Sequence, residues 1–216
     1  MGDRTDNDYD AFAAAYSAMN ETNDWNAGYE RPAVLAMLGD ITGLRTLDAG
    51  ARGRRARRRV GVARCHRHRC RHERRTARAR RRPAGVHRGT AAGRHRVLHY
   101  LQGWTVPLRE FSQTPVPGGR LVISTHHPFM DHALAGGDDY FATCAFDDEW
   151  QVGDRSVRMR FWHRQLAAMS GALTRGGFAL TVIDEPAPQL WVEDLDPRAW
   201  QSLTTARFLF FGAEAP

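Results

Sequence analysis

The clearest structural signal in this chain is the stretch LRTLDAG, residues 44–50. Apolar residues lead up to an acid and a glycine, a pattern typical of a buried strand with a turn at its end. We therefore predict a strand that ends at Asp48 and a tight turn at Gly50. The residues that follow Gly50 are rich in arginine, and what they do is the main question that the sequence raises.

Helical and strand patterns alternate on both sides of this stretch. An alanine-rich helix over residues 8–19 would place Phe12, Tyr16 and Met19 on one face, and Pro32 begins a second helix that Gly39 ends. Such alternation is typical of an α/β fold with a largely parallel sheet. The later elements that we expect are helices at 104–111, 162–174 and 197–203, strands at 120–125, 178–183 and 206–212, and a long polar loop over 126–160.

The bulk properties indicate one globular domain over residues 1–216. The chain has a mass of 24.4 kDa and 42% hydrophobic residues, and no apolar run is long enough to cross a membrane. The first residues are acidic and polar, so a secretory signal is not expected. The three cysteines, Cys65, Cys70 and Cys144, form no disulfide framework, and we expect a reducing, cytoplasmic location.

The charge of the chain is concentrated in one segment. A net charge of +7 and a pI near 10.1 are typical of a nucleic-acid-binding protein. All 31 basic residues are arginine, however, and 19 of them lie in residues 51–96 beside a single acid, Glu73. That segment has a net charge of +18, whereas the rest of the chain has a net charge of −11. The basic character belongs to the segment and not to the whole protein.

Several motifs outside this segment resemble one family. LDAG, VLHYLQGWTVPLREF and PVPGGRLVISTHHP occur in that order, and the end of the chain, with RGGFALTVIDEP and ARFLFFGAE, looks like a closing helix and antiparallel hairpin. Over residues 8–50 and 97–216 the chain resembles class I S-adenosylmethionine-dependent methyltransferases of the small-molecule type. The resemblance implies a Rossmann-like three-layer sandwich with a mostly parallel sheet and a C-terminal antiparallel strand, damaged here around its second to fourth strands.

The resemblance also implies a cofactor, S-adenosylmethionine, and a turn that would hold it. In the family this turn reads roughly D-x-G-x-G-x-G, because glycine lets the backbone approach the cofactor closely. Asp48 and Gly50 match its opening, and Gly53 is one place out. Arg52 and Arg54 stand where small residues are expected. An acid at the end of the second strand, which binds the ribose in the family, has no counterpart, since Glu73 lies inside an arginine run.

Residues 51–96 allow four interpretations. They contain three valines and no Leu, Ile, Met or aromatic residue, so as a structural element they would be disordered or poorly packed. A basic arm for nucleic acid would have the charge but no aromatic ring for base stacking. A zinc site could use the thiols and imidazoles of residues 65–72, but the C-x4-C pair has no second pair at typical spacing.

The fourth interpretation is a segment translated in the wrong reading frame. The absence of lysine suggests a GC-rich gene, in which shifted arginine codons encode Gly, Ala, Val, Asp or Glu. For residues 65–69 a shift of one base permits Val-Thr-Gly-Ile-Asp, the kind of strand that would end in the ribose-binding acid. We favour this hypothesis for residues 51–96.

Candidate site residues follow the predicted strands. His126 and His127 come after the strand that starts near Leu121, where an α/β protein binds ligands, and either could be a general base or part of a polar pair that caps the strand. His99 and Tyr100 could contact the methyl acceptor or the cofactor. Tyr16 could close over the cofactor or belong to the core. We expect no metal site.

Two functional hypotheses remain open from the sequence. The first is an enzyme that transfers a methyl group from S-adenosylmethionine to a small-molecule acceptor, with an activity that the arginine-rich segment impairs. The second is an α/β domain that binds or modifies nucleic acid through that segment. The charge distribution favours the first, because a nucleic-acid surface should draw on several elements. The sequence indicates neither the acceptor nor the oligomeric state.

Overall fold

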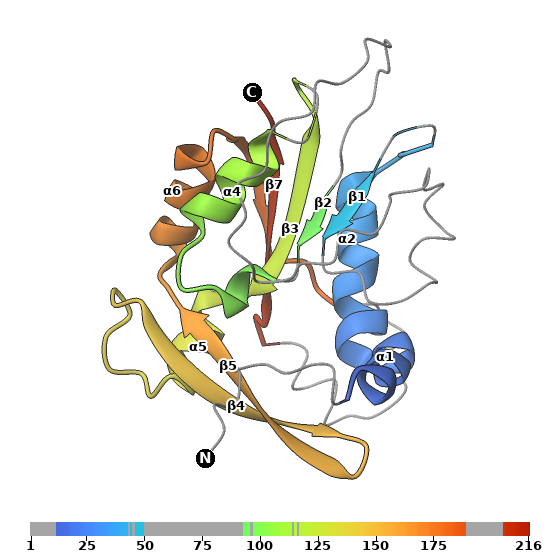
Figure 1. Cartoon of the computed structure of the whole chain (residues 1–216), viewed down its shortest axis with the longest axis vertical. Helices are drawn as coiled ribbons and strands as arrows, with labels where there is room; N and C mark the ends of the chain where they lie inside the picture. Colours follow the sequence, from blue (N-terminus) through green and yellow to red (C-terminus); the bar gives the residue numbers. More distant parts are fainter. Residues whose placement is uncertain are drawn as a thin grey trace, which may run out of the picture.

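The computed structural model describes residues 12–49 apart from 43 and 45, residues 93–95, residues 97–188 apart from 114 and 116, and residues 205–216 (Figure 1). Five described strands form one sheet in the order β1-β2-β3-β7-β6. These strands are β1 (Leu47–Ala49), β2 (Gly93–His95), β3 (Arg120–His126), β7 (Phe208–Glu214) and β6 (Ala179–Asp184).

Strand directions agree with the predicted mixed sheet. Strands β1, β2 and β3 are parallel to one another, and β7 is antiparallel to both of its neighbours, β3 and β6. It follows that β6 runs in the same direction as β3. The α/β class and the antiparallel C-terminal strand are therefore confirmed, and the carboxyl ends of β1, β2 and β3 lie along one edge of the sheet.

Strand β2 lies near the end of the arginine-rich segment. Gly93, Arg94 and His95 form a parallel strand, with Asp48 opposite Arg94 on one side and Val122 opposite Arg94 on the other. Backbone hydrogen bonds between strands need no particular side chain, so this short run can pair between β1 and β3 despite its composition. Residues 50–92 lie outside the described residues. The expectation that residues 51–96 are disordered or poorly packed stays a prediction for the rest of the segment.

Helices cover both faces of the sheet around β3. Leu121 and Ile123 pack on one face with residues of α4 (Thr105–Ser112) and α6 (Leu166–Arg175). Val122 faces the other way and packs against Val34 and Leu38 of α2 (Arg31–Leu38). Alternate residues of a strand point to opposite faces, so β3 is buried on both sides (Figure 1).

The N-terminal helices largely follow the prediction. Helix α1 (Ala13–Thr22) continues through a π-helical turn, η2 (Asp24–Glu30), into α2. Gly39 ends α2 with a φ of 62°, a backbone conformation that favours glycine. The helix predicted at 104–111 is α4, and the helix predicted at 197–203 lies outside the described residues. No described helix is both long and apolar enough to cross a bilayer.

The prediction of a long polar loop over residues 126–160 is wrong. This region contains the short helix α5 (Pro128–Leu134) and a long antiparallel hairpin of β4 (Cys144–Val152) and β5 (Arg155–His163). Gly153 has a φ of 65° in the two-residue turn between the strands, which suits a tight hairpin. Because β5 runs to His163, the helix predicted from residue 162 begins only at Leu166.

One face of the hairpin is apolar and packs on the N-terminal helix. Phe146, Met159 and Phe161 are buried in a cluster with Phe12, the residue just before α1. Tyr16 joins this cluster by stacking on Trp150 of β4, with 5.8 Å between ring centroids. The predicted apolar face of α1 is thereby confirmed, and its partner is the hairpin.

The other face of the hairpin carries an ion-pair cluster that yields a first prediction. The Asp147 carboxylate accepts hydrogen bonds from Arg160, at 2.9 Å from Nε, and from Arg158. The bond from Arg160 is the main reason that the pKa of Asp147 lies below its usual range; burial opposes the shift and Arg158 adds to it. Because the folded-state pKa is lowered, the stabilisation is complete above the unfolded-state value and is lost as the pH falls through the folded-state value.

Replacing Asp147 with Asn should therefore lower the free energy of unfolding at pH 7 by about 0.5–1 kcal/mol, the usual range for a largely exposed pair. The difference from the unmodified chain should shrink as the pH falls through the lowered folded-state pKa of Asp147, because the carboxyl group is then protonated in both the folded and the unfolded state. Urea denaturation at pH 7 and at a pH below that pKa measures it, with Asp138→Asn as the exposed control. If Asp147→Asn lowers the free energy of unfolding by the same amount at both pH values, the charge of the carboxylate is not involved.

Candidate active site

Two of the predicted site residues meet at the carboxyl edge of the sheet. His99 lies on a 3-10 turn, η3 (Leu98–Tyr100), which follows β2, and His126 is the last residue of β3. Their imidazole rings are stacked, with 4.3 Å between centroids and an angle of 7° between planes. Both residues are buried, with exposed fractions of 3% and 8%. The edge where ligands bind in α/β folds thus carries a histidine pair.

Asp131 of α5 contacts the imidazole ring of His126. Its Oδ1 lies 3.0 Å from Nδ1 of His126, and the aspartate is completely buried. Sequence reasoning missed this residue. The available signal was Pro128, which favours the first turn of a helix and so predicts that the chain turns back after His126.

The loop that carries His99 is held from two directions. The indole Nε1 of Trp104 donates a hydrogen bond of 2.7 Å to the carbonyl of Leu98, and Arg164 donates to the carbonyls of Leu101 and Gln102. The Arg164 guanidinium also lies over the Trp104 ring, 4.7 Å from its centroid. The position of His99 is therefore fixed by the side chain of the residue just before α4 and by that of the residue just after β5.

Arg164 also connects this loop electrostatically to Asp131. Burial lowers the pKa of the Arg164 guanidinium to about 10, and the negative charge of Asp131 opposes that shift. A buried cation beside a buried carboxylate is stable only as a pair. Arg164 thus interacts both with the loop that carries His99 and with the carboxylate that contacts His126.

Aromatic rings of the hairpin close the site on one side. Phe161 of β5 lies 4.8 Å from the His126 ring and 5.5 Å from the His99 ring, centroid to centroid. Tyr100, predicted with His99 as a substrate contact, stacks on the same phenylalanine at 5.1 Å. The structure thus brings His99, Tyr100 and His126 together around one buried ring.

His127 belongs to a different set of contacts. Its Nδ1 accepts a hydrogen bond from the backbone N–H of Phe129 and so caps α5. Its Nε2 lies 2.5 Å from Oε1 of Glu185, just beyond β6. Because Nδ1 accepts, the proton of a neutral ring is on Nε2, which donates to Glu185. Both ring nitrogens of His127 form hydrogen bonds, whereas in His126 only Nδ1 forms one with the described residues.

A second buried carboxylate links the N-terminal helices to β3. Glu30, at the end of η2, is fully buried and accepts a hydrogen bond of 2.6 Å from the hydroxyl of Ser124. Ser124 lies two residues before His126 and so faces the same side of the strand. π-Helical turns often occur at functional sites, and this one ends beside the strand that carries His126.

The predicted cofactor contacts are only partly described. Asp48 lies in β1, in register with Arg94 of β2, at the same edge as the histidine pair. Gly50 and Gly53 lie outside the described residues. Tyr16 packs between Phe12 and Trp150, in the cluster shared by α1 and the hairpin.

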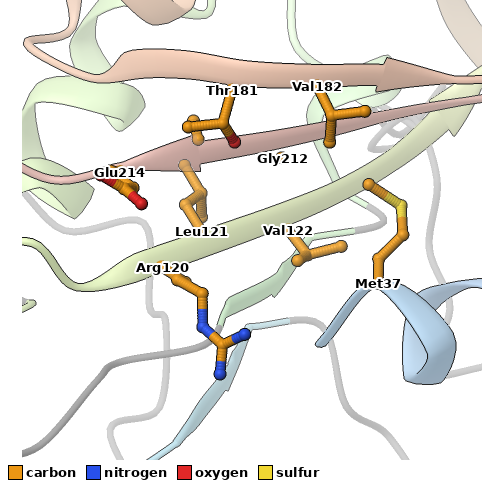
Figure 2. A pocket seen from close by; sticks show the side chains of 9 residues that line it. Met37, Arg120, Leu121, Val122, Thr181, Val182, Gly212 and Glu214 are labelled. Carbon is orange, nitrogen blue, oxygen red and sulfur yellow. The ribbon is translucent and has the colours of Figure 1, made fainter. Parts of the chain in front are cut away.

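A small cavity of about 110 Å³ lies at the opposite end of β3 (Figure 2). Figure 2 shows Met37, Val122 and Val182 around Gly212 of β7. A Cβ at position 212 would lie 2.6 Å from Cγ1 of Val182, so glycine allows the Val182 side chain to pack closely against β7 here. The cavity borders the amino-terminal half of β3 and is therefore separate from the predicted site.

Two further alternatives gain no support from the described residues. In the part of the chain that the structure describes, no three His, Cys, Asp or Glu side chains are grouped to hold a metal ion. Two of the three arginines of the hairpin, Arg158 and Arg160, pair with Asp147. A nucleic-acid surface would rest on residues 51–96, which lie outside the described residues except at positions 93–95.

Comparison with known proteins gives structural matches only. No family model and no curated protein matches the chain. A protein of Listeria monocytogenes assigned to the S-adenosylmethionine-dependent methyltransferases aligns at 17% identity and a TM-score of 0.47, over 59% of this chain and 61% of its own. An S-adenosylmethionine-dependent methyltransferase of Mesorhizobium loti aligns at 21% identity and a TM-score of 0.41, over 58% and 61%.

The CcbJ methyltransferase of Streptomyces caelestis aligns at 12% identity and a TM-score of 0.36, over 59% of this chain and 60% of its own. The aligned region thus spans about three-fifths of the length of each of these proteins.

Proposed function

We propose that this chain has the Rossmann-like three-layer sandwich of a class I methyltransferase and transfers a methyl group from S-adenosylmethionine to a small-molecule acceptor. One observation supports the proposal above all. The parallel strands β1, β2 and β3 bring Ala49 of the LDAG motif, His99 and His126 to the same edge of the sheet. Ligands of α/β proteins bind at the carboxyl ends of parallel strands.

The end of β1 supports the proposed cofactor site. Strand β1 pairs with β2 up to Ala49, opposite His95, and the glycine of LDAG is the next residue in the sequence. A glycine at that point leaves room for a ligand against the backbone. Asp48, Gly50 and Gly53 are the residues that we expect to hold S-adenosylmethionine. Tyr16 would act indirectly, through the packing of α1 against the hairpin.

When bound, S-adenosylmethionine supplies an electrophilic methyl group on a sulfonium centre. Transfer of this group depends mainly on alignment of the acceptor, so a rigid site is the principal requirement. The hydrogen bonds from Trp104 and Arg164 meet that requirement for the turn that carries His99 and Tyr100. In our proposal those two residues contact the acceptor, and His126 receives its proton.

Titration with S-adenosylhomocysteine tests the binding site without a known acceptor. Chemical shifts in two-dimensional NMR spectra should change at the amides of Ala49, His99 and His126 and stay constant at Thr181 and Gly212, which border the cavity at the other end of β3. NMR reports binding even when the dissociation constant is millimolar. Changes confined to Thr181 and Gly212, or no changes at several millimolar ligand, would contradict the proposal.

The reading-frame hypothesis for residues 51–96 is part of the same proposal. The wrong frame would explain why LDAG is followed by arginines where the family has a glycine-rich turn. Return to the original frame before residue 97 would explain why the family motifs resume at VLHYL. Independent reads of the gene across codons 50–97 test it, and one uninterrupted frame in all of them would refute it.

A further inference from the structure

The contact between His126 and Asp131 has a consequence for the chemistry of the site. Asp131 is completely buried, and its Oδ1 lies 3.0 Å from Nδ1 of His126. A carboxylate is only an acceptor of hydrogen bonds, so the histidine must donate from Nδ1. In the neutral imidazole the other nitrogen, Nε2, then has a free lone pair. Among the described residues no hydrogen bond to that Nε2 occurs, and the His126 side chain keeps an exposed fraction of 10%.

Arg164 belongs to the electrostatic surroundings of Asp131. The guanidinium interacts with this carboxylate and donates hydrogen bonds to the carbonyls of Leu101 and Gln102, in the loop after His99. The second oxygen of Asp131 is buried and has no hydrogen bond in the described part of the chain, and the same is true of Nε of Arg164. A negative charge at this position would also stabilise an imidazolium that forms on His126 when it takes a proton.

We propose that Asp131 is a positioning residue that holds His126 as the Nδ1–H tautomer, so that Nε2 accepts a proton from the methyl acceptor. This inference rests on the proposed function. It implies an acceptor whose nucleophilic atom carries a proton, with a hydroxyl as the simplest case. A thioether or a tertiary amine has no proton to lose and needs no such base.

The proton balance of the step is simple for a hydroxyl acceptor. The hydroxyl oxygen forms a bond to the methyl carbon while the carbon–sulfur bond breaks, and that electron pair remains on the sulfur as a neutral thioether. The hydroxyl proton moves to Nε2 of His126. The products are the methyl ether, S-adenosylhomocysteine and an imidazolium that faces the Asp131 carboxylate.

Nitrogen NMR of histidine-labelled protein tests the tautomer directly, without acceptor or cofactor. His126→Gln identifies the His126 signals by their loss. In the unmodified chain we expect a protonated Nδ1 and a bare Nε2 at a pH where the ring is neutral. An unprotonated Nδ1 in the neutral His126 ring would overturn the proposal, irrespective of the results with the variants.

Asp131→Asn should reverse the tautomer. The amide oxygen should turn toward Arg164, which presents only donors, and the amide nitrogen would then donate to Nδ1 of His126. We therefore expect loss of the Nδ1–H signal and appearance of an Nε2–H signal. Asp139→Asn is the control, because Asp139 is exposed and caps the N–H of Phe141; its spectrum should match that of the unmodified chain. An unchanged tautomer in folded Asp131→Asn protein would also overturn the proposal.

The two proposals fail in different ways. If S-adenosylhomocysteine binds at the carboxyl edge but His126 is bare at Nδ1, methyl transfer stands and the role of Asp131 is wrong. If His126 has the expected Nδ1–H tautomer but S-adenosylhomocysteine perturbs no amide at this edge, the role of Asp131 in orienting His126 stands and the proposed function is wrong.

Discussion

Changing Arg52 and Arg54 to glycine together should tighten binding of S-adenosylhomocysteine at least about tenfold, which corresponds to about 1.4 kcal/mol. The double substitution converts residues 48–54 from DAGARGR to DAGAGGG, which satisfies the family pattern D-x-G-x-G-x-G. Glycine permits backbone conformations and close approaches that an arginine side chain prevents. Isothermal titration calorimetry of the two proteins measures the change.

The matched control is Arg57→Gly with Arg59→Gly. It removes the same two charges at the same spacing, but beyond the region that matches the family turn. Comparing S-adenosylmethionine with S-adenosylhomocysteine separates the two possible causes, because only the first carries the positive sulfonium. A steric effect of the turn improves both ligands in the first variant alone. Equal gains in both variants, restricted to the sulfonium ligand, would mean that charge repulsion is responsible and that residues 48–54 are not a cofactor turn.

The same pair of variants bears on the nucleic-acid hypothesis. If the arginines of residues 51–96 bind a nucleic-acid backbone, each double substitution should weaken oligonucleotide binding by a similar amount and reduce its salt dependence. Neither should then affect binding of S-adenosylhomocysteine. The cofactor response of the first variant is therefore the result that distinguishes the enzyme from the binding module.

Local signals explain which elements the sequence predicts correctly. Pro32 and Gly39 mark the ends of α2 because each has a backbone preference that acts within one turn. The apolar run of β3 is recognisable because both of its faces are buried. His99 and His126 could be placed near the site because each follows a predicted strand, and the carboxyl ends of parallel strands share an edge.

The parts that the sequence did not predict depend on contacts between distant residues. In β4 the acids Asp147, Asp148 and Glu149 resemble a solvated loop, and their role as strand residues depends on pairing with β5. The two-residue turn Gly153–Asp154 was the local signal for that hairpin. Asp131 looks like an ordinary helix acid until the fold brings Arg164, which follows β5, close enough to interact with it electrostatically. The role that we propose for it depends on tertiary contacts.

Removal of the Phe161 ring should have the largest effect on stability. Phe161 is fully buried and contacts the rings of His99, Tyr100 and His126 at the sheet edge as well as two rings of β4, Phe146 and Trp150. Truncation of such a residue leaves a cavity and costs about 3–5 kcal/mol. We expect Phe161→Ala to lower the free energy of unfolding by that amount in chemical denaturation. Phe141→Ala is matched in chemistry, but its side chain is 73% exposed, so it should cost about 0.5 kcal/mol or less.

The position of Phe161 also predicts which regions lose protection together. If this ring joins the hairpin to the sheet edge, its removal should speed hydrogen exchange at the amides of Met159 in β5 and of His126 in β3 by similar factors, because both then open in one unit. Faster exchange at Met159 alone would mean that the hairpin opens independently of the sheet edge. The stacked arrangement of His99 and His126 would then not depend on the hairpin. The first result would make the hairpin part of the active site, since the stacking of His99 on His126 would then depend on a side chain supplied by β5.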